Sequence, residues 1–173
     1  MTTTAIAETE RLVLRELTFD DVGDLFEIFS DPEAMRYYPS TKSLDETRHW
    51  VTWNRDLYAR YGFGLWAVVL KETSEVVGDC GLVTQRVEGR DEVELGYHTK
   101  RGHWRQGIAT EAGLACRGIA FEKLDLDRLI SIIRPKNSAS ARVAEKVGLR
   151  PSRQIVYRGL PHVLYVLERT VLC

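Results

Sequence analysis

The sequence predicts an α/β (α+β) protein built on a mixed, mostly antiparallel sheet of about seven strands with flanking helices. Strand-like and helix-like patterns alternate along the chain, and no low-complexity linker separates them. Strands joined by short polar turns outnumber crossover connections, which favours antiparallel pairing. With 173 residues, 44% of them hydrophobic, the chain can bury one full core, so we expect residues 1–173 to form a single domain.

The first part of the chain predicts one strand and two helices. Leucines alternate with charged residues over Arg11–Leu17, as in a half-buried strand. Helical spacing of apolar residues follows from Val22 to Phe29 and ends at Asp31-Pro32. A longer helix over Leu44–Tyr61 ends at Gly62 and Gly64. N-capping pairs stand before both helices: Thr18 with Asp21, and Ser43 with Glu46.

The middle of the chain predicts three strands. Leu65–Leu70 and Val76–Thr84 are apolar runs separated by a short polar turn, which indicates a hairpin. A charged loop is expected over Arg86–Asp91, and a fourth strand over Glu92–His98.

The last part predicts two helices, one strand and a closing hairpin. A helix runs from about Gly107 to Lys123, and Arg128–Ile133 is a β-branched strand. Asn137 caps a short helix that reaches Lys146 and ends at Gly148. The closing hairpin is expected over Arg153–Arg158 and His162–Arg169, with its turn at Gly159-Leu160-Pro161.

The composition excludes several classes of partner. Twenty-four Lys and Arg residues balance 25 Asp and Glu residues, whereas nucleic-acid binders usually carry a basic excess. Apolar runs are shorter than the roughly 20 residues that cross a bilayer. The first ten residues carry threonines and acids rather than an export signal. Three scattered cysteines, Cys80, Cys116 and Cys173, are expected to be reduced thiols in a cytoplasmic protein.

The segment Trp104–Ala112 carries the clearest functional signal. It follows an apolar strand, begins as a basic loop containing Gly107, and runs directly into a helical pattern. The first turn of a helix offers N–H groups without intrahelical partners, and its dipole attracts anions. Gly107 allows close approach of a phosphate, and Arg101 and Arg105 add positive charge. The spacing fits neither a P-loop nor a dinucleotide fingerprint, so a different phosphorylated ligand is expected.

Five segments, in order along nearly the whole chain, resemble the GNAT superfamily of N-acetyltransferases, in its ribosomal-protein alanine and serine acetyltransferase-like branch. The segments are Thr9–Arg15, Val77–Leu82, Glu94–Tyr97, Trp104–Ala112, and Asn137–Ser140 leading into Glu145–Leu149. The resemblance implies an N-acetyltransferase that moves an acetyl group from acetyl-CoA to a primary amine, without a metal. The acceptor is either a protein N-terminus or a small amine, and the protein is a monomer or a homodimer.

The resemblance also implies where the coenzyme binds. The fourth and fifth predicted strands splay apart, and the pantetheine arm lies between them along Leu95, Gly96 and Tyr97. Asn137 reaches the pantetheine, and Ser140 lies near the thioester sulfur. The pyrophosphate is surrounded by the backbone N–H groups of Arg105, Gln106, Gly107, Ile108, Ala109 and Thr110. The chain departs from the general family pattern in two places, with Trp104 opening the loop and Arg105 standing where glycine is frequent.

Four residues are candidates for proton transfer. Glu94 and Glu92 share one face of a strand, and either could act as general base. Ser140 is the first candidate for the donor that protonates the departing thiolate, and Tyr157 is the alternative. A structural role remains open for each of them, as a solvated carboxylate, a helix residue or a packed aromatic side chain.

Other residues are expected to be structural. His98 and His103 flank the anion loop without a carboxylate or second histidine at ligand spacing, so no metal site is expected. The aromatic residues around the helix Leu44–Tyr61 are mostly expected in the core. Two further functions stay open, namely a catalytically silent acyl-CoA-binding or sensing module, and an interaction domain in which the loop only caps a helix.

Overall fold

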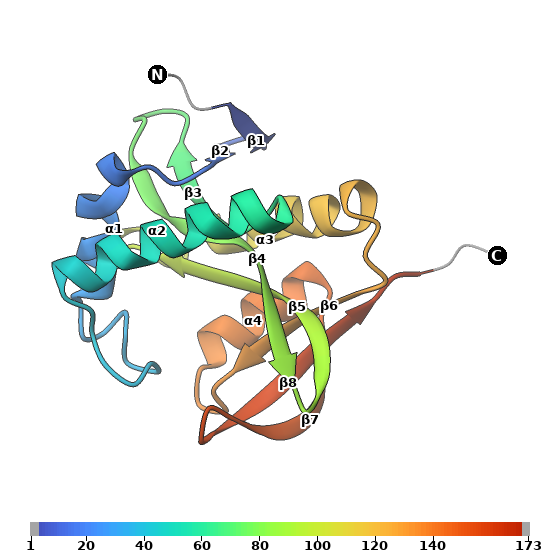
Figure 1. Ribbon diagram of the computed structural model, residues 1–173. Helices are drawn as coiled ribbons and strands as arrows, with labels where there is room; N and C mark the ends of the chain where they lie inside the picture. Colours follow the sequence, from blue (N-terminus) through green and yellow to red (C-terminus); the bar gives the residue numbers. More distant parts are fainter. Residues whose placement is uncertain (1–3, 171–173) are drawn as a thin grey trace.

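The computed structural model describes residues 4–170, which form a single eight-stranded sheet in the order β1-β2-β3-β4-β5-β6-β8-β7 (Figure 1). β5 and β6 are parallel, and the other neighbouring strands are antiparallel. The strands are β1 (Ala5–Glu8), β2 (Leu12–Arg15), β3 (Leu65–Leu70), β4 (Val76–Val87), β5 (Arg90–Thr99), β6 (Arg128–Ile133), β7 (Arg150–Tyr157) and β8 (Leu160–Glu168). The predicted fold class is confirmed.

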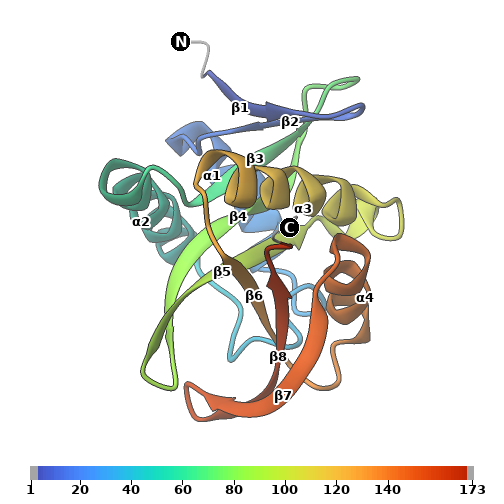
Figure 2. The same cartoon turned by 90° about the vertical axis from the view of Figure 1, so that its right-hand side faces the viewer.

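Helices cover both faces of the sheet, and α2 and α4 lie on opposite sides in Figure 2. The four α-helices are α1 (Val22–Phe29), α2 (Leu44–Tyr61), α3 (Ile108–Gly118) and α4 (Ser138–Val147). Trp66 and Ala67 are adjacent in β3 and therefore point to opposite faces. Trp66 packs in the core cluster that contains α3 and α4, whereas Ala67 packs with α1 and the start of α2. We call these the α3/α4 face and the α1/α2 face.

Two predictions of local structure were wrong. The strand β1 was not predicted, although it pairs with β2 at the edge of the sheet. The segment Arg86–Asp91 is no loop, because β4 and β5 continue to a tight turn at Glu88 and Gly89. Both turn residues adopt positive φ angles, 48° and 82°, as in the type I′ turns that join twisted strands. Arg86 and Asp91 then pair across the two strands at 2.7 Å.

The turn of the closing hairpin is also shifted from its predicted place. Positive φ angles fall on Arg158 (48°) and Gly159 (76°), and Pro161 already pairs with Val156 in the ladder. The hairpin itself is confirmed, because β7 and β8 pair over most of their length.

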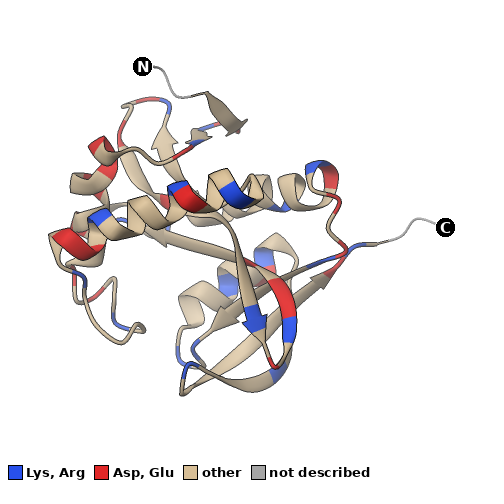
Figure 3. Cartoon of the chain, viewed as in Figure 1, with Lys and Arg blue, Asp and Glu red and all other residues tan. Residues whose placement is uncertain are grey.

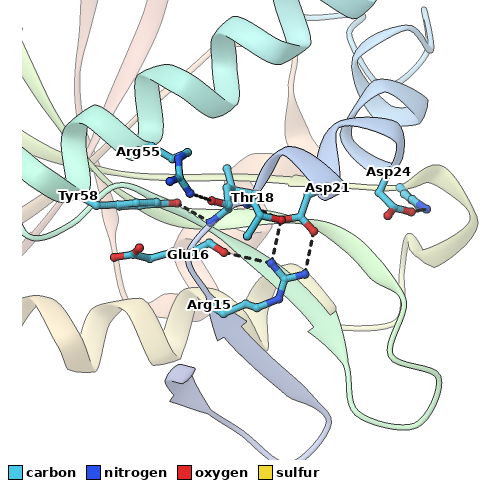
Figure 4. A network of polar contacts seen from close by, with 9 residues as sticks. Arg15, Glu16, Thr18, Asp21, Asp24, Arg55 and Tyr58 are labelled. Carbon is cyan, nitrogen blue, oxygen red and sulfur yellow. Dashed lines mark hydrogen bonds and ion pairs between the residues drawn. The ribbon is translucent and has the colours of Figure 1, made fainter. Parts of the chain in front are cut away.

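A polar network joins β2 to α1 and α2 (Figure 4). Asp21 closes the predicted capping pair with Thr18 and also binds the Arg15 guanidinium through both oxygens, at 2.8 Å each. Arg55 donates to the Leu17 carbonyl, and the Tyr58 hydroxyl accepts from the Leu17 N–H. This network fixes α2 against the segment that follows β2.

Free thiols occur at two of the predicted positions. Cys80 on β4 and Cys116 on α3 are buried, with their sulfurs 3.6 Å apart, and Cys173 lies outside the described residues. The contact with Cys116, together with burial, raises the pKa of the Cys80 thiol. Acidic and basic side chains are interspersed over the chain (Figure 3). Within residues 4–170, no helix is both long enough and apolar enough to span a membrane.

Candidate active site

The candidate site begins where β5 and β6 separate. Their ladder consists of one pair, Glu94 with Ile130, whereas β4 and β5 pair from Gly78 with Thr99 to Val87 with Arg90. The Leu95 carbonyl faces β6, where it accepts a hydrogen bond of 2.9 Å from the Ser131 hydroxyl. Residues two apart in a strand direct their backbone groups to the same edge, so Tyr97 presents its backbone to the opening gap.

The anion loop is shaped by two left-handed residues. Arg105 and Gly107 have φ angles of 61° and 77°, and α3 starts at Ile108. Such a conformation turns successive N–H groups toward one point and forms an anion-binding nest. Among residues 4–170, the backbone N–H groups of residues 105 to 110 donate to no protein acceptor. The positive φ of Arg105 also explains why glycine would suit this position.

The charges around the loop are arranged differently from the prediction. Arg101 is engaged by Asp31 at 3.1 Å, so its charge is partly neutralised, whereas Arg105 is exposed. Arg11, from the start of β2, binds the Glu111 carboxylate at 2.7 Å and the Gln106 carbonyl at 2.9 Å. Burial of Glu111 opposes ionisation, but hydrogen bonds from Thr9 and Arg11 lower its pKa overall. The N-terminal motif Thr9–Arg15 therefore supports the loop.

Glu94 lies on the α1/α2 face in a chain of neutral hydrogen-bond partners. Its carboxylate accepts from the Gln85 amide at 2.8 Å, and the Tyr157 hydroxyl donates to the other end of Gln85. Burial raises the pKa of Glu94, although bonds from Gln85 and from the Ile132 N–H act in the opposite sense. Glu94 and Tyr157, from distant parts of the chain, are thus brought into one network.

Glu92 has a different environment on the same face. Its buried carboxylate is paired with Arg128 at 3.2 Å and with Arg90 at 3.5 Å. Two guanidinium groups therefore occupy the Glu92 carboxylate. Of the two acids proposed as base, Glu94 is the one without such an ion pair.

Ser140 and Asn137 lie on the α3/α4 face. The Asn137 side chain accepts from the Ser140 N–H and caps α4, as predicted. The Ser140 hydroxyl donates to the Tyr97 hydroxyl at 3.1 Å, and Tyr97 donates to the Ser140 carbonyl at 2.7 Å. Desolvation raises the pKa of Tyr97, against the effect of the Ser140 bond. Ser140 therefore lies on one side of β5, beside the gap, and the Glu94 side chain lies on the other side.

One cluster on the α1/α2 face was missed in the sequence. Asp79 is fully buried and accepts from Trp50 Nε1 at 2.9 Å and from His98 Nδ1 at 2.7 Å. The His98 ring packs at 5.2 to 5.7 Å from three aromatic rings: Phe29, Tyr38 and Trp50. Two signals were available: Asp79 interrupts an apolar strand, and His98 occurs in phase with Glu94.

An open cavity of about 470 Å³ adjoins the Glu94 network on the β4–β5 hairpin. Its lining comprises Tyr61, Thr84, Gln85, Arg86, Asp91, Glu92 and Val93. Within residues 4–170, no three His, Cys, Asp or Glu side chains are grouped to hold a metal ion.

Comparison with known proteins places this geometry in a family. YkkB of Bacillus subtilis (strain 168) is 39% identical over 158 residues, which cover 91% of this chain and 92% of YkkB. The crystal structure of an acetyltransferase from Agrobacterium tumefaciens superposes with a TM-score of 0.84 at 28% identity, over 98% of this chain and 96% of that one. RimL, a ribosomal L7/L12 α-N-protein acetyltransferase solved with coenzyme A, shares the fold, with a TM-score of 0.78, 20% identity, and coverage of 95% and 98%. The acetyltransferase (GNAT) domain matches residues 11–150, and the chain therefore belongs to the GNAT family of N-acetyltransferases, which use acetyl-CoA.

Proposed function

We propose that this protein transfers the acetyl group of acetyl-CoA to a primary amine, on a protein N-terminus or a small molecule, by direct attack in a ternary complex. The observation that carries the proposal is the run of unpaired N–H groups from Arg105 to Thr110, beside strands that meet at a single residue pair. A diphosphate satisfies donors of this kind, and an extended arm fits the edge of a strand.

The coenzyme occupies the loop and the gap. Backbone N–H groups of Arg105, Gln106, Gly107, Ile108, Ala109 and Thr110 hold the pyrophosphate, with the exposed Arg105 side chain adding charge. Leu95, Gly96 and Tyr97 line the pantetheine on β5, and Asn137 reaches it from the cap of α4. RimL, which has the same fold and was solved with coenzyme A, supports this assignment.

The amine approaches from the α1/α2 face, and the thiolate leaves toward the α3/α4 face. Glu94 is the general base for the amine, because its raised pKa suits proton transfer nearer to neutral pH. Ser140, backed by the Tyr97 hydroxyl, protonates the thiolate. Tyr157 is the alternative donor, although its hydroxyl already donates to Gln85. A backbone N–H of β5 meets the developing oxyanion.

Direct attack, rather than an acetylated enzyme, is favoured by the position of the thiols. Cys80 and Cys116 are buried between β4 and α3 and bind each other, so neither is presented to a thioester in the gap. Holding an amine about 3 Å from an activated carbonyl supplies much of the required acceleration.

The test measures thiol release from acetyl-CoA in the presence of a panel of peptides with free N-termini, polyamines and aminoglycosides. Amine-dependent release with intersecting initial-rate lines is the expected result. Tight coenzyme binding without release for any amine would instead identify a silent acyl-CoA-binding module. A stable acetyl-enzyme seen by mass spectrometry would contradict direct attack.

A further inference from the structure

We propose that His98, held by Asp79, is a second proton acceptor of the reaction and takes a proton from the entering ammonium group of the acceptor. The proposal rests on the proposed amine acetylation and adds a residue to it.

The first step concerns the tautomer of His98. Asp79 is fully buried, and its two oxygens accept from Trp50 Nε1 and face His98 Nδ1 at 2.7 Å. A carboxylate in this position fixes the proton of a neutral imidazole on Nδ1 and leaves the lone pair on Nε2. Asp79 therefore prepares Nε2 to accept a proton.

The second step concerns access to Nε2. The His98 side chain is 9% exposed. Within residues 4–170, its Nε2 atom has no hydrogen-bond partner and is not fully buried. On one side of the ring stands Tyr38, which is 44% exposed. The nitrogen is thus within reach of solvent and of a ligand that lies against Tyr38.

The third step places His98 beside the base already proposed. Glu94, Gly96 and His98 point to the same face of β5, and four residues of strand span roughly 13 Å. Gly96, at the centre of this strip, has no side chain, and the Leu65 side chain lies beside it. Glu94 and Asp79 both act on the Tyr38 hydroxyl, whose pKa is raised first by burial and then by these carboxylates. Glu94, Gly96 and His98 therefore form one strip on the α1/α2 face, with Tyr38 against the His98 ring.

The fourth step is the proton balance. An ammonium acceptor must lose one proton before its nitrogen can attack, and the nitrogen loses a second proton once the new C–N bond has formed. The thiolate regains one proton when the C–S bond breaks, so one proton is released to solvent. Two protons leave nitrogen, and two bases on the same face of β5 match that number. His98 takes the first proton, and Glu94 takes the second.

The surroundings of His98 also favour an entering cation. The rings of Phe29, Tyr38 and Trp50 surround the imidazole, and aromatic faces attract ammonium groups. Lys42 already lies over Trp50 at 5.4 Å. The titratable groups that face His98 are Asp79 on β4, Tyr38 before α2, and Glu94 on its own strand.

The test compares His98→Asn with wild type for the best amine of the panel. An asparagine amide can keep the hydrogen bond to Asp79 but offers no basic nitrogen. We expect kcat/KM at pH 7 to fall about 100-fold, with coenzyme affinity unchanged. Added imidazole should restore activity to His98→Ala. The exposed His49→Asn variant, on the surface of α2, is the matched control and should behave as wild type.

Two results would overturn the proposal: a His98→Asn variant with the wild-type rate and pH profile, or a His98→Ala variant that imidazole does not rescue. If wild type acetylates no amine, the proposed function fails, and the state of His98 is then read by nitrogen NMR. A proton on Nδ1 with titration at Nε2 supports the dyad, whereas a neutral ring protonated on Nε2 refutes it.

Discussion

Arg11 Nη2 lies 2.7 Å from Glu111 Oε2, so that the start of β2 is tied to the first turn of α3. An acidic residue at the mouth of an anion site would repel a diphosphate unless its charge is compensated. Arg11 supplies that compensation and also holds the Gln106 carbonyl away from the ligand side of the loop. The pair explains why a motif near the N-terminus belongs to the coenzyme site.

Replacing Arg11 with methionine should weaken coenzyme binding about 3- to 10-fold, because Glu111 is left uncompensated beside the pyrophosphate. Calorimetric titration with CoA measures the change. Adding Glu111→Gln to Arg11→Met should recover most of the lost affinity, since both charges are then absent. A double variant that binds no better than Arg11→Met would contradict the charge argument.

Gly107→Asp should abolish measurable CoA binding, a loss of at least about 100-fold, because the position requires φ near 77° and the new side chain would meet Arg11 and add negative charge to the anion loop. Gly89→Asp is the matched control, since Gly89 has φ 82° and open space around it but lies at the β4–β5 turn. Equal losses of affinity in both variants would show that general destabilisation, and not the anion site, is responsible.

The anion loop could be predicted from sequence because its chemistry is local. A strand, a basic loop with Gly107 and a helix start are contiguous, and the backbone provides the donors. The Glu94 network could not be predicted, because Gln85 reaches Glu94 through the register of β4 on β5, and Tyr157 arrives from β7. The missed Asp79–His98 contact depends on the same register, which pairs these two residues directly. The turn at Glu88 was mistaken for a loop because its charged neighbours looked solvated.

Glu94→Gln should lower kcat about 100-fold and leave CoA affinity nearly unchanged, because it removes the base and keeps the shape. The wild-type profile of kcat should lose activity on acidification at a pH above the usual carboxyl range, because burial raises the pKa of Glu94. The variant should lose the contribution of Glu94 to that limb. Glu92→Gln, which changes the other acid on the same face of β5, is the control and should keep the acidic limb of the pH profile.

Glu94→Gln should also stabilise the folded protein at neutral pH. A carboxyl group whose pKa is higher in the folded than in the unfolded state binds more protons when folded, so stability falls as pH rises through the two values. Glu94→Gln carries no such penalty and should show a higher midpoint of thermal unfolding than wild type at pH 8. At pH 4 the difference should shrink. A variant less stable at pH 8 would show that the Gln85 bond outweighs desolvation.

Ser140→Ala should slow turnover about 10- to 100-fold if the hydroxyl protonates the leaving thiolate. A donor for the leaving group matters less when that group is already a weak base, so the defect should diminish with an acyl donor whose thiol has a lower pKa than CoA. Tyr97→Phe removes the hydroxyl that supports Ser140 and should show a smaller defect of the same kind. Tyr157→Phe, on the opposite face, separates the two donors. If Tyr157→Phe alone shows the defect that depends on the leaving group, the tyrosine is the donor and Ser140 only part of the first turn of α4.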